Sequence, residues 1–195
     1  MEKSYLLFGH NYLMSRVGKK LITLPSGVTA TLDSGVLTVK GPQGELKRAF
    51  KDSIAINING SEITLLPMAK SERGLSAAKP LWGTYSSHVQ NMVKGAAEGF
   101  TKELIVEGIG FKAAVVGESL NLELGFSHPI KMPIPAGVKV TVERGNMTMK
   151  GSDIEVLGQF AASVRALKPT EPYKGKGIRY VGEHILRKQG KKTAA

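Results

Sequence analysis

The sequence predicts an α+β protein made of two tandem, duplicated small antiparallel β-sheet domains, each covered by a helix, with a basic C-terminal extension. Three features of the 195-residue chain predict this: an internal repeat, alternating β-rich runs joined by turns, and one helical stripe in each half. The repeat relates residues 25–41 (PSGVTATLDSGVLTVKG) to residues 135–151 (PAGVKVTVERGNMTMKG), with eight of 17 positions identical at an offset of 110. Two copies so far apart favour a domain duplication over a short-period solenoid.

The first repeat domain is expected over residues 16–98. A Pro-x-Gly turn opens its repeat hairpin, and a turn centred on Gly35 sends the chain back as a second alternating run. Further strands are expected at 44–50, 54–58 and 62–66. An apolar stripe from Ala78 to Ala96 then predicts a helix that starts near residue 79, because Pro80 fits only the first turn of a helix.

The second repeat domain is expected over residues 99–167, with strands at 103–107, 111–116 and 120–124 before its copy of the repeat hairpin. Ser152 and Glu155 form a capping-box pattern at the start of a helix that Lys168-Pro169 ends. The Met, Trp and Tyr residues in the two helical stripes are interpreted as core contacts and not as a cofactor site.

Residues 1–15 are expected to be an N-terminal arm, and Met14 is a candidate start that would make residues 1–13 dispensable. No apolar run approaches the roughly 18–20 residues that a membrane helix needs, and no signal peptide is recognisable. The chain has no cysteine, which fits a reducing compartment and excludes disulfides, thiolate nucleophiles and Cys-ligated zinc.

The chain carries a formal net charge of +11 and has a pI near 9.8, which favours a polyanionic partner, either nucleic acid or an anionic membrane surface. The charge is concentrated at the ends. Residues 168–195 hold eight basic and two acidic residues, a net charge of +6. Residues 21–167 hold 15 basic and 13 acidic residues, a net charge of only +2.

The C-terminal extension, residues 168–195, interleaves basic residues with glycine and tyrosine, a pattern typical of RNA contact. Cations bind phosphates, tyrosines stack on bases or ribose, and glycines permit close backbone approach. A solvated tail is the simpler alternative, and a membrane surface is disfavoured because no wide apolar helical face is present. We expect both domains to fold without the residues after Leu167. The predicted RNA-binding residues are Lys168, Tyr173, Lys174, Gly175, Lys176, Gly177, Arg179, Tyr180, Arg187, Lys188, Lys191 and Lys192.

No catalytic, cofactor-binding or metal-binding residues are expected. The four histidines are scattered, with neither ligand spacing nor a neighbouring nucleophile pattern. Gly108-Ile109-Gly110 lacks the third glycine of a phosphate loop and lies between two expected strands, so it is interpreted as a strand-end turn.

Five segments together resemble the bacterial-type sixth protein of the large ribosomal subunit, the L-six (uL-six) family. The resemblance covers residues 14–192, and 171–180 is its most specific segment, although Thr170 stands where the family usually has a second proline. The segments are SRVGKK at 15–20, VLTVKGPQG at 36–44, NMVKGAAEGF at 91–100, GFSHP at 125–129 and EPYKGKGIRY at 171–180.

The resemblance implies a non-enzymatic structural constituent of the large ribosomal subunit that binds large-subunit (23S-type) rRNA near the stalk base and supports translation. It implies that the partners are this rRNA and neighbouring large-subunit proteins, with no membrane and no small-molecule substrate. The expected location is the cytoplasmic ribosome, and an organellar ribosome is left open. Two alternatives remain: a free RNA-binding or chaperone protein outside the ribosome, and an enzyme with a cryptic site.

Overall fold

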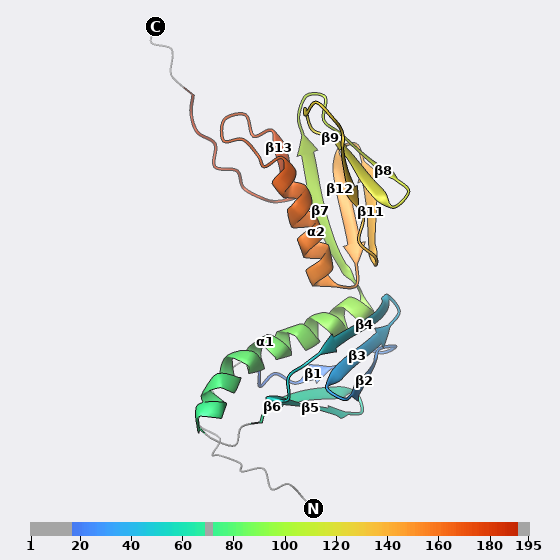
Figure 1. Cartoon of the computed structure of the whole chain (residues 1–195), viewed down its shortest axis with the longest axis vertical. Helices are drawn as coiled ribbons and strands as arrows, with labels where there is room; N and C mark the ends of the chain where they lie inside the picture. Colours follow the sequence, from blue (N-terminus) through green and yellow to red (C-terminus); the bar gives the residue numbers. More distant parts are fainter. Residues whose placement is uncertain (1–16, 69–71, 191–195) are drawn as a thin grey trace, which may run out of the picture. The chain divides into compact units, whose positions relative to one another are not determined.

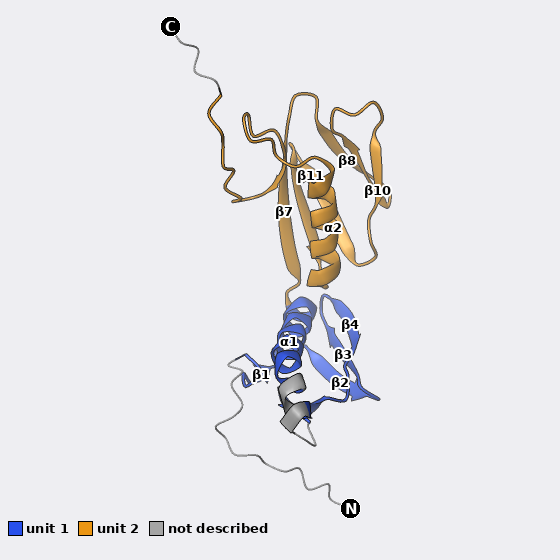
Figure 2. Ribbon diagram, turned by 60° about the vertical axis from the view of Figure 1, so that its left-hand side comes forward, with its two compact units in different colours: residues 1–97 blue, residues 98–195 orange. Residues whose placement is uncertain are grey.

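The computed structural model describes residues 17–68 and 72–190, and the chain divides into two compact units, residues 1–97 and 98–195 (Figure 2). Both units combine small antiparallel sheets with one long helix, which confirms the α+β class and the tandem organisation. The arm at 1–15 and Met14 lie outside the described residues.

Unit 1 consists of two three-stranded antiparallel sheets, ordered β2-β3-β4 and β1-β6-β5, against which helix α1 packs (Figure 1). The strand between the two edge strands of each sheet, β3 or β6, makes the most contacts with α1 and buries alternate side chains. The elements are β1 (Ile22–Thr23), β2 (Thr29–Asp33), β3 (Val36–Gly41), β4 (Gly44–Ala49), β5 (Ile54–Asn59), β6 (Glu62–Pro67) and α1 (Glu72–Ala97).

Unit 2 repeats this plan with one added strand. Its sheets are ordered β10-β9-β8 and β11-β12-β7-β13, and helix α2 packs against β7, β12 and β13 (Figure 1). The elements are β7 (Phe100–Glu107), β8 (Lys112–Val116), β9 (Ser119–Glu123), β10 (Ile130–Pro133), β11 (Val138–Glu143), β12 (Asn146–Gly151), α2 (Ile154–Leu167) and β13 (Gly177–Tyr180).

The β-structure of the two units contains four equivalent hairpins. They are β2–β3, β5–β6, β8–β9 and β11–β12, each closed by a two-residue turn. Each is preceded by a tight turn in which the N–H of one residue donates to the carbonyl three residues earlier, as from Val28 to Pro25 and from Val138 to Pro135, both at 3.2 Å. The second strand of each hairpin buries two side chains at the same distance from the turn. These pairs are Leu37 and Val39, Ile63 and Leu65, Leu120 and Leu122, and Met147 and Met149.

In each unit, the strand that leads into one hairpin pairs with the other hairpin, so the two hairpins exchange their leading strands. In unit 1, β4 leads into β5–β6 and pairs with β3, and β1 leads into β2–β3 and pairs with β6. In unit 2, β10 pairs with β9 and β7 pairs with β12. Every exchange ends on an equivalent hydrogen bond to the hairpin turn, for example Phe50 N–H to Gly35 O at 2.8 Å and Val106 N–H to Gly145 O at 2.9 Å.

The sequence match at an offset of 110 therefore compares the first hairpin with the fourth. Gly27 and Gly137 occupy equivalent turn positions, with φ of 85° and 82°, and both segments are β-hairpins as predicted. In chain order, however, the counterpart of β2–β3 is β8–β9, so the counterpart of Gly27 is Gly110.

Helix α1 starts earlier than the sequence predicts. It runs from Glu72 through Pro80, which therefore lies in the helix interior and not in its first turn. An interior proline removes one helical hydrogen bond and crowds the preceding turn. Burial of Ala78 and Trp82 on either side of Pro80 offsets this cost, because both side chains belong to the core of unit 1.

The N-cap of α2 also differs from the prediction by one residue. Asp153, not Ser152, has the extended backbone of an N-cap, and its side-chain oxygen accepts the N–H of Glu155 at 2.8 Å. A carboxylate at this position satisfies a free N–H and interacts favourably with the helix dipole.

Strand β13 makes part of the predicted extension an integral element of unit 2. It pairs antiparallel with β7, and Ile178 is fully buried in the core among Leu104, Met147 and Val164. Its Gly177 lies against the backbone of Pro169, where a Cβ would come within 2.6 Å of the Pro169 carbonyl oxygen. The expectation that the domains are complete at Leu167 therefore does not hold for unit 2, because its core includes a side chain from residues 168–195.

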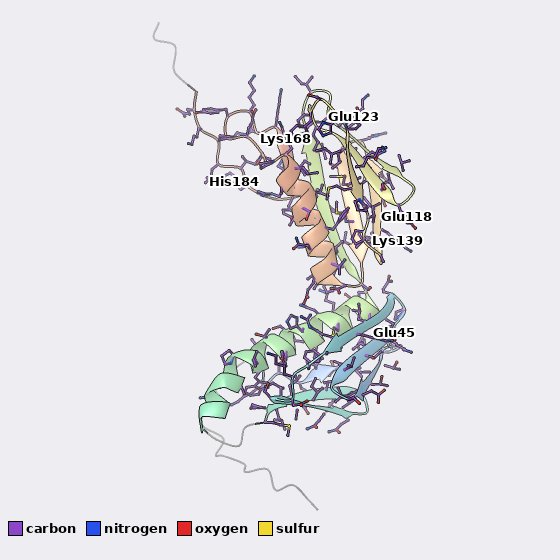
Figure 3. All side chains as sticks on the ribbon, viewed as in Figure 1. Glu45, Glu118, Glu123, Lys139, Lys168 and His184 are labelled. Carbon is purple, nitrogen blue, oxygen red and sulfur yellow. The ribbon has the colours of Figure 1, made fainter. Side chains whose placement is uncertain are left out.

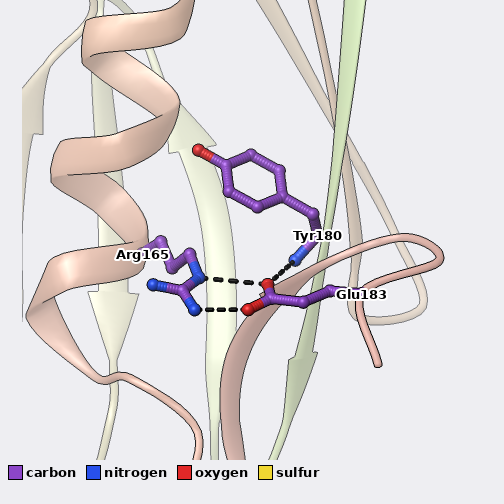
Figure 4. Close-up of polar contacts among 3 residues, drawn as sticks. All are labelled: Arg165, Tyr180 and Glu183. Atoms are coloured by element: carbon purple, nitrogen blue, oxygen red, sulfur yellow. Dashed lines mark hydrogen bonds and ion pairs between the residues drawn. The ribbon is translucent and has the colours of Figure 1, made fainter. Parts of the chain in front are cut away.

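A bidentate ion pair holds the chain after β13 against α2 (Figure 4). Arg165 donates to both carboxylate oxygens of Glu183, through Nε at 3.1 Å and also through Nη2, and Tyr180 N–H donates to Glu183 Oε2 at 3.0 Å. The Arg165 hydrogen bonds, followed by that of Tyr180, lower the pKa of Glu183 below its usual range. The same pairing raises the pKa of Arg165.

Replacing Ile178 with alanine should destabilise unit 2 by about 2–5 kcal/mol, because the substitution leaves a cavity in a fully buried position. The single Trp, Trp82, lies in unit 1, so its fluorescence reports on that unit while circular dichroism reports on both. In urea unfolding, Ile178→Ala should shift the dichroism transition and leave the Trp82 transition in place. Val181→Ala, at a half-exposed position, is the control. Equal stability of the two variants would contradict the assignment of β13 to the core.

Replacing Glu183 with glutamine should remove a pH-dependent contribution to stability. Because folding lowers the pKa of Glu183, its stabilising effect is present above the unfolded pKa of about 4.3 and is lost as the pH falls through the lower folded value. The difference in free energy of unfolding between wild type and Glu183→Gln should thus be largest near neutral pH and shrink in acid. Glu118→Gln, in an exposed turn, is the control, and a pH-independent difference would refute the ion-pair explanation.

Candidate nucleic-acid interface

The residues predicted to contact RNA begin where α2 ends. Lys168 is the C-cap of α2 and is labelled in Figure 3. Its Nζ lies 5.1 Å from the ring centroid of Phe126. A cation over an aromatic face is attracted by the ring quadrupole. Phe126 is itself half-exposed, so this pair presents a positive charge beside an accessible aromatic surface.

The segment after Lys168 is a folded loop. Glu171 N–H donates to Lys176 O at 2.9 Å, and Gly175 N–H donates to Glu171 O at 3.2 Å. Gly175 has a φ of +73°, which a residue with a side chain adopts only at a cost. These contacts close the loop on itself and direct the side chains of Tyr173 and Lys174 outward, where both are exposed.

The chain beyond β13 folds back onto this loop. Lys188 N–H donates to Pro172 O at 2.8 Å. The guanidinium of Arg187 covers Gly175 so closely that a Cβ there would lie 3.0 Å from Nη2. Gly175 and Gly177, predicted to let the backbone approach RNA, thus let the chain approach itself. Two distant parts of the sequence now meet in one basic loop cluster, which consists of Lys168, Lys174, Lys176, Arg187 and Lys188.

Two predicted residues lie apart from this cluster. Arg179 Nη2 donates to Glu107 at 2.7 Å. Tyr180 packs against the core of unit 2, with the guanidinium carbon of Arg165 6.0 Å from its ring centroid. Both side chains therefore have intramolecular roles in holding β13. Lys191 and Lys192 lie outside the described residues.

The cluster has an excess of positive charge because the extension that carries it contains only two acidic residues, Glu171 and Glu183. Of the two acidic residues in the extension, Glu183 is engaged by Arg165, and Glu171 is exposed in the loop. None of the five basic side chains forms an ion pair with another described residue. Cations on one folded segment that form no ion pair within the described part of the chain are available to phosphate groups.

Sequence reasoning did not include Phe126 in the site. Its segment, GFSHP at 125–129, carries only the family resemblance, and nothing local to it indicates the contact with Lys168. Over the residues that the structure describes, no group of three or more His, Asp or Glu side chains could hold a metal ion. No described helix is long and apolar enough to cross a membrane.

Comparison with known proteins gives consistent results over nearly the whole chain. The family model described as ribosomal protein L6 matches twice, at residues 24–99 and 107–181. These spans follow the chain-order correspondence of the two units.

Individual relatives are also similar. Large ribosomal subunit protein uL6 of Magnetococcus marinus is 46% identical over 180 residues, covering 92% of this chain and 99% of that protein. The uL6 of Desulfatibacillum aliphaticivorans is 47% identical over 182 residues, covering 93% and 100%. That of Enterococcus faecalis is 45% identical over 179 residues, covering 91% and 98%. With two matches to the family model and this level of identity, the chain belongs to the ribosomal protein L6 family.

Proposed function

We propose that this protein is a structural constituent of the large ribosomal subunit that binds large-subunit rRNA through the basic loop cluster. Membership of the L6 family supports the ribosomal role. The observation that supports the RNA contact is that five basic residues lie on one folded loop and on the segment that folds back onto it. The protein acts on the ribosome in the cytoplasm, next to the stalk base and in contact with neighbouring large-subunit proteins, and it has no catalytic role.

The geometry favours recognition of RNA shape over base sequence. Lysine and arginine side chains at the loop surface match phosphate oxygens, and exposed Tyr173 and Phe126 offer flat faces to ribose or an unpaired base. No side chain of the cluster forms a hydrogen bond with another described side chain. None is therefore fixed in an orientation that would select one base edge over another. A loop that is already folded also loses little conformational entropy when it binds.

Sedimentation separates this role from that of a free RNA-binding or chaperone protein. Tagged protein should co-sediment with large subunits in a sucrose gradient and remain with them in a high-salt wash. A chaperone that acts outside the ribosome would leave the subunit fraction under those conditions. Release into the light fractions at high salt would contradict the proposed function.

Replacing Lys174 and Lys176 together with glutamine should flatten the salt dependence of rRNA binding. If both contact phosphates, the slope of log K against log salt should become less negative by about 1.4–1.8 units. Tyr173→Ala should weaken binding without changing the slope, because stacking releases no counterions. Filter binding to protein-free large-subunit rRNA over a salt series measures both quantities.

The control for this experiment is Lys131→Gln with Lys139→Gln, two exposed lysines on other strands of unit 2. A slope change of the same size in the control would mean that the charge of the whole unit, and not the loop cluster, determines binding.

A further inference from the structure

Unit 1 has a basic segment whose backbone is held in place more firmly than a solvated surface requires. Residues 17–20 form a tight turn closed by Lys20 N–H donating to Val17 O at 3.2 Å. The turn leads into β1, whose Ile22 is buried and pairs with Ile63. The backbone of this segment is therefore fixed at its C-terminal end by the sheet.

Two side chains of α1 fix the other end of the turn. Ser86 is fully buried, and its hydroxyl donates to Val17 O at 3.0 Å. Gly18 is buried against the face of Trp82 so closely that a Cβ at this position would overlap the indole ring. Trp82 is held in turn by its Nε1–H, which donates to Leu65 O at 2.8 Å. The only tryptophan of the chain and a fully buried hydroxyl thus both hold one four-residue turn.

The side chains that this turn presents are suited to RNA. Lys19 and Lys20 are exposed, and neither forms an ion pair with another described residue. Val17 and Leu21, on either side of them, are 46% and 44% exposed. Adjacent cations flanked by accessible apolar surface can neutralise phosphate while packing on ribose. Two solvated lysines alone would gain nothing from a fixed backbone, whereas lysines that bind a fixed RNA lose less entropy on binding when the backbone is fixed beforehand.

We propose that the turn at residues 17–20, together with Leu21 after it, is a second phosphate-binding site for large-subunit rRNA, located on unit 1 and independent of the basic loop cluster of unit 2. The proposal rests on the proposed function, because it assumes that the protein binds this RNA. Lys19 and Lys20 supply the phosphate contacts. Gly18, Trp82 and Ser86 are positioning residues, since they act by fixing the backbone that carries the two lysines.

The charge contribution is tested in the full-length chain by replacing Lys19 and Lys20 together with glutamine. The slope of log K against log salt for protein-free large-subunit rRNA should become less negative by about 1.4–1.8 units. The matched control is Lys51→Gln with Lys79→Gln, which removes the same charge from two other lysines of the same unit that form no ion pair with a described residue. Gly18→Ala keeps both lysines but displaces the turn, so it should reproduce the effect of Lys19→Gln/Lys20→Gln. An unchanged slope in the lysine variant, or an equal change in the control, would overturn the proposal.

Proximity to RNA is tested with an RNA-cleaving probe that is attached to a single introduced cysteine. Because the chain has no native cysteine, the probe attaches only at the chosen position. Iron–EDTA is attached to single-cysteine variants Leu21→Cys, Leu32→Cys and Leu186→Cys, and each is assembled into large subunits. The first lies at the turn, the second is exposed on β2 of the same unit, and the third lies beside the basic loop cluster. The proposal expects strong rRNA cleavage from positions 21 and 186 and weak cleavage from 32.

The other cleavage patterns distinguish failure of the second site from failure of the proposed function. Cleavage from position 186 alone would leave the proposed function standing and refute the second site. Equal cleavage from 21 and 32 would refute it as well, because RNA would then surround unit 1 without selecting the turn. No cleavage from any position would count against the proposed function itself.

Discussion

Each unit depends on the exchange of leading strands between its two hairpins. A two-stranded hairpin alone is marginally stable in water, and a third strand is needed before one face can be buried. In unit 1 the third strand of each sheet is the strand that leads into the other hairpin, through the β3–β4 and β1–β6 pairings. The two sheets are thereby linked along the chain, and the buried pairs Leu37–Val39 and Ile63–Leu65 enter one core together with α1. Unit 2 follows the same rule, with β13 added at the edge of its larger sheet.

This scaffold explains why the basic residues are held on short, fixed segments. The loop of unit 2 starts at the C-cap of α2 and returns through β13, so both of its ends are tied to the core. The turn of unit 1 is fixed at one end by the contact of Gly18 with Trp82 and at the other end by the β1–β6 pairing. In both places a glycine permits a close contact, with Arg187 over Gly175 in one and Trp82 over Gly18 in the other. Side-chain packing thereby sets the positions of cations that the fold itself does not use in ion pairs.

Most of the β-structure could be predicted from the sequence, because its signals are local. Alternating apolar residues and two-residue turns locate the hairpins within a few residues of their observed ends. The β3–β4 pairing is local, because Gly41 pairs with Gly44 across a two-residue turn. The β1–β6 pairing could not be predicted, since it joins Ile22 to Ile63, far apart in the chain, through contacts that no local pattern encodes. The start of α1 was misplaced for a related reason. Pro80 is a local signal for a first turn, and the burial of Ala78 and Trp82 overrides it only in the folded protein.

The candidate site shows the same division between composition and placement. Charge counting correctly finds an unusually basic extension, but it cannot separate residues that face solvent from those that hold the chain. Arg179 and Tyr180 have the same composition signal as Lys174 and Tyr173, yet the former pair contacts Glu107 and the core while the latter pair is exposed. The difference arises because Ile178 is apolar and fully buried, which places the residues on either side of it in strand β13. Side chains alternate between the two faces of a strand, so the residues next to Ile178 lie on the opposite, outer face of the sheet. There Arg179 forms an ion pair with Glu107 of the adjacent strand β7. Apolar content within a basic segment is therefore the feature that separates its structural part from the part available to RNA.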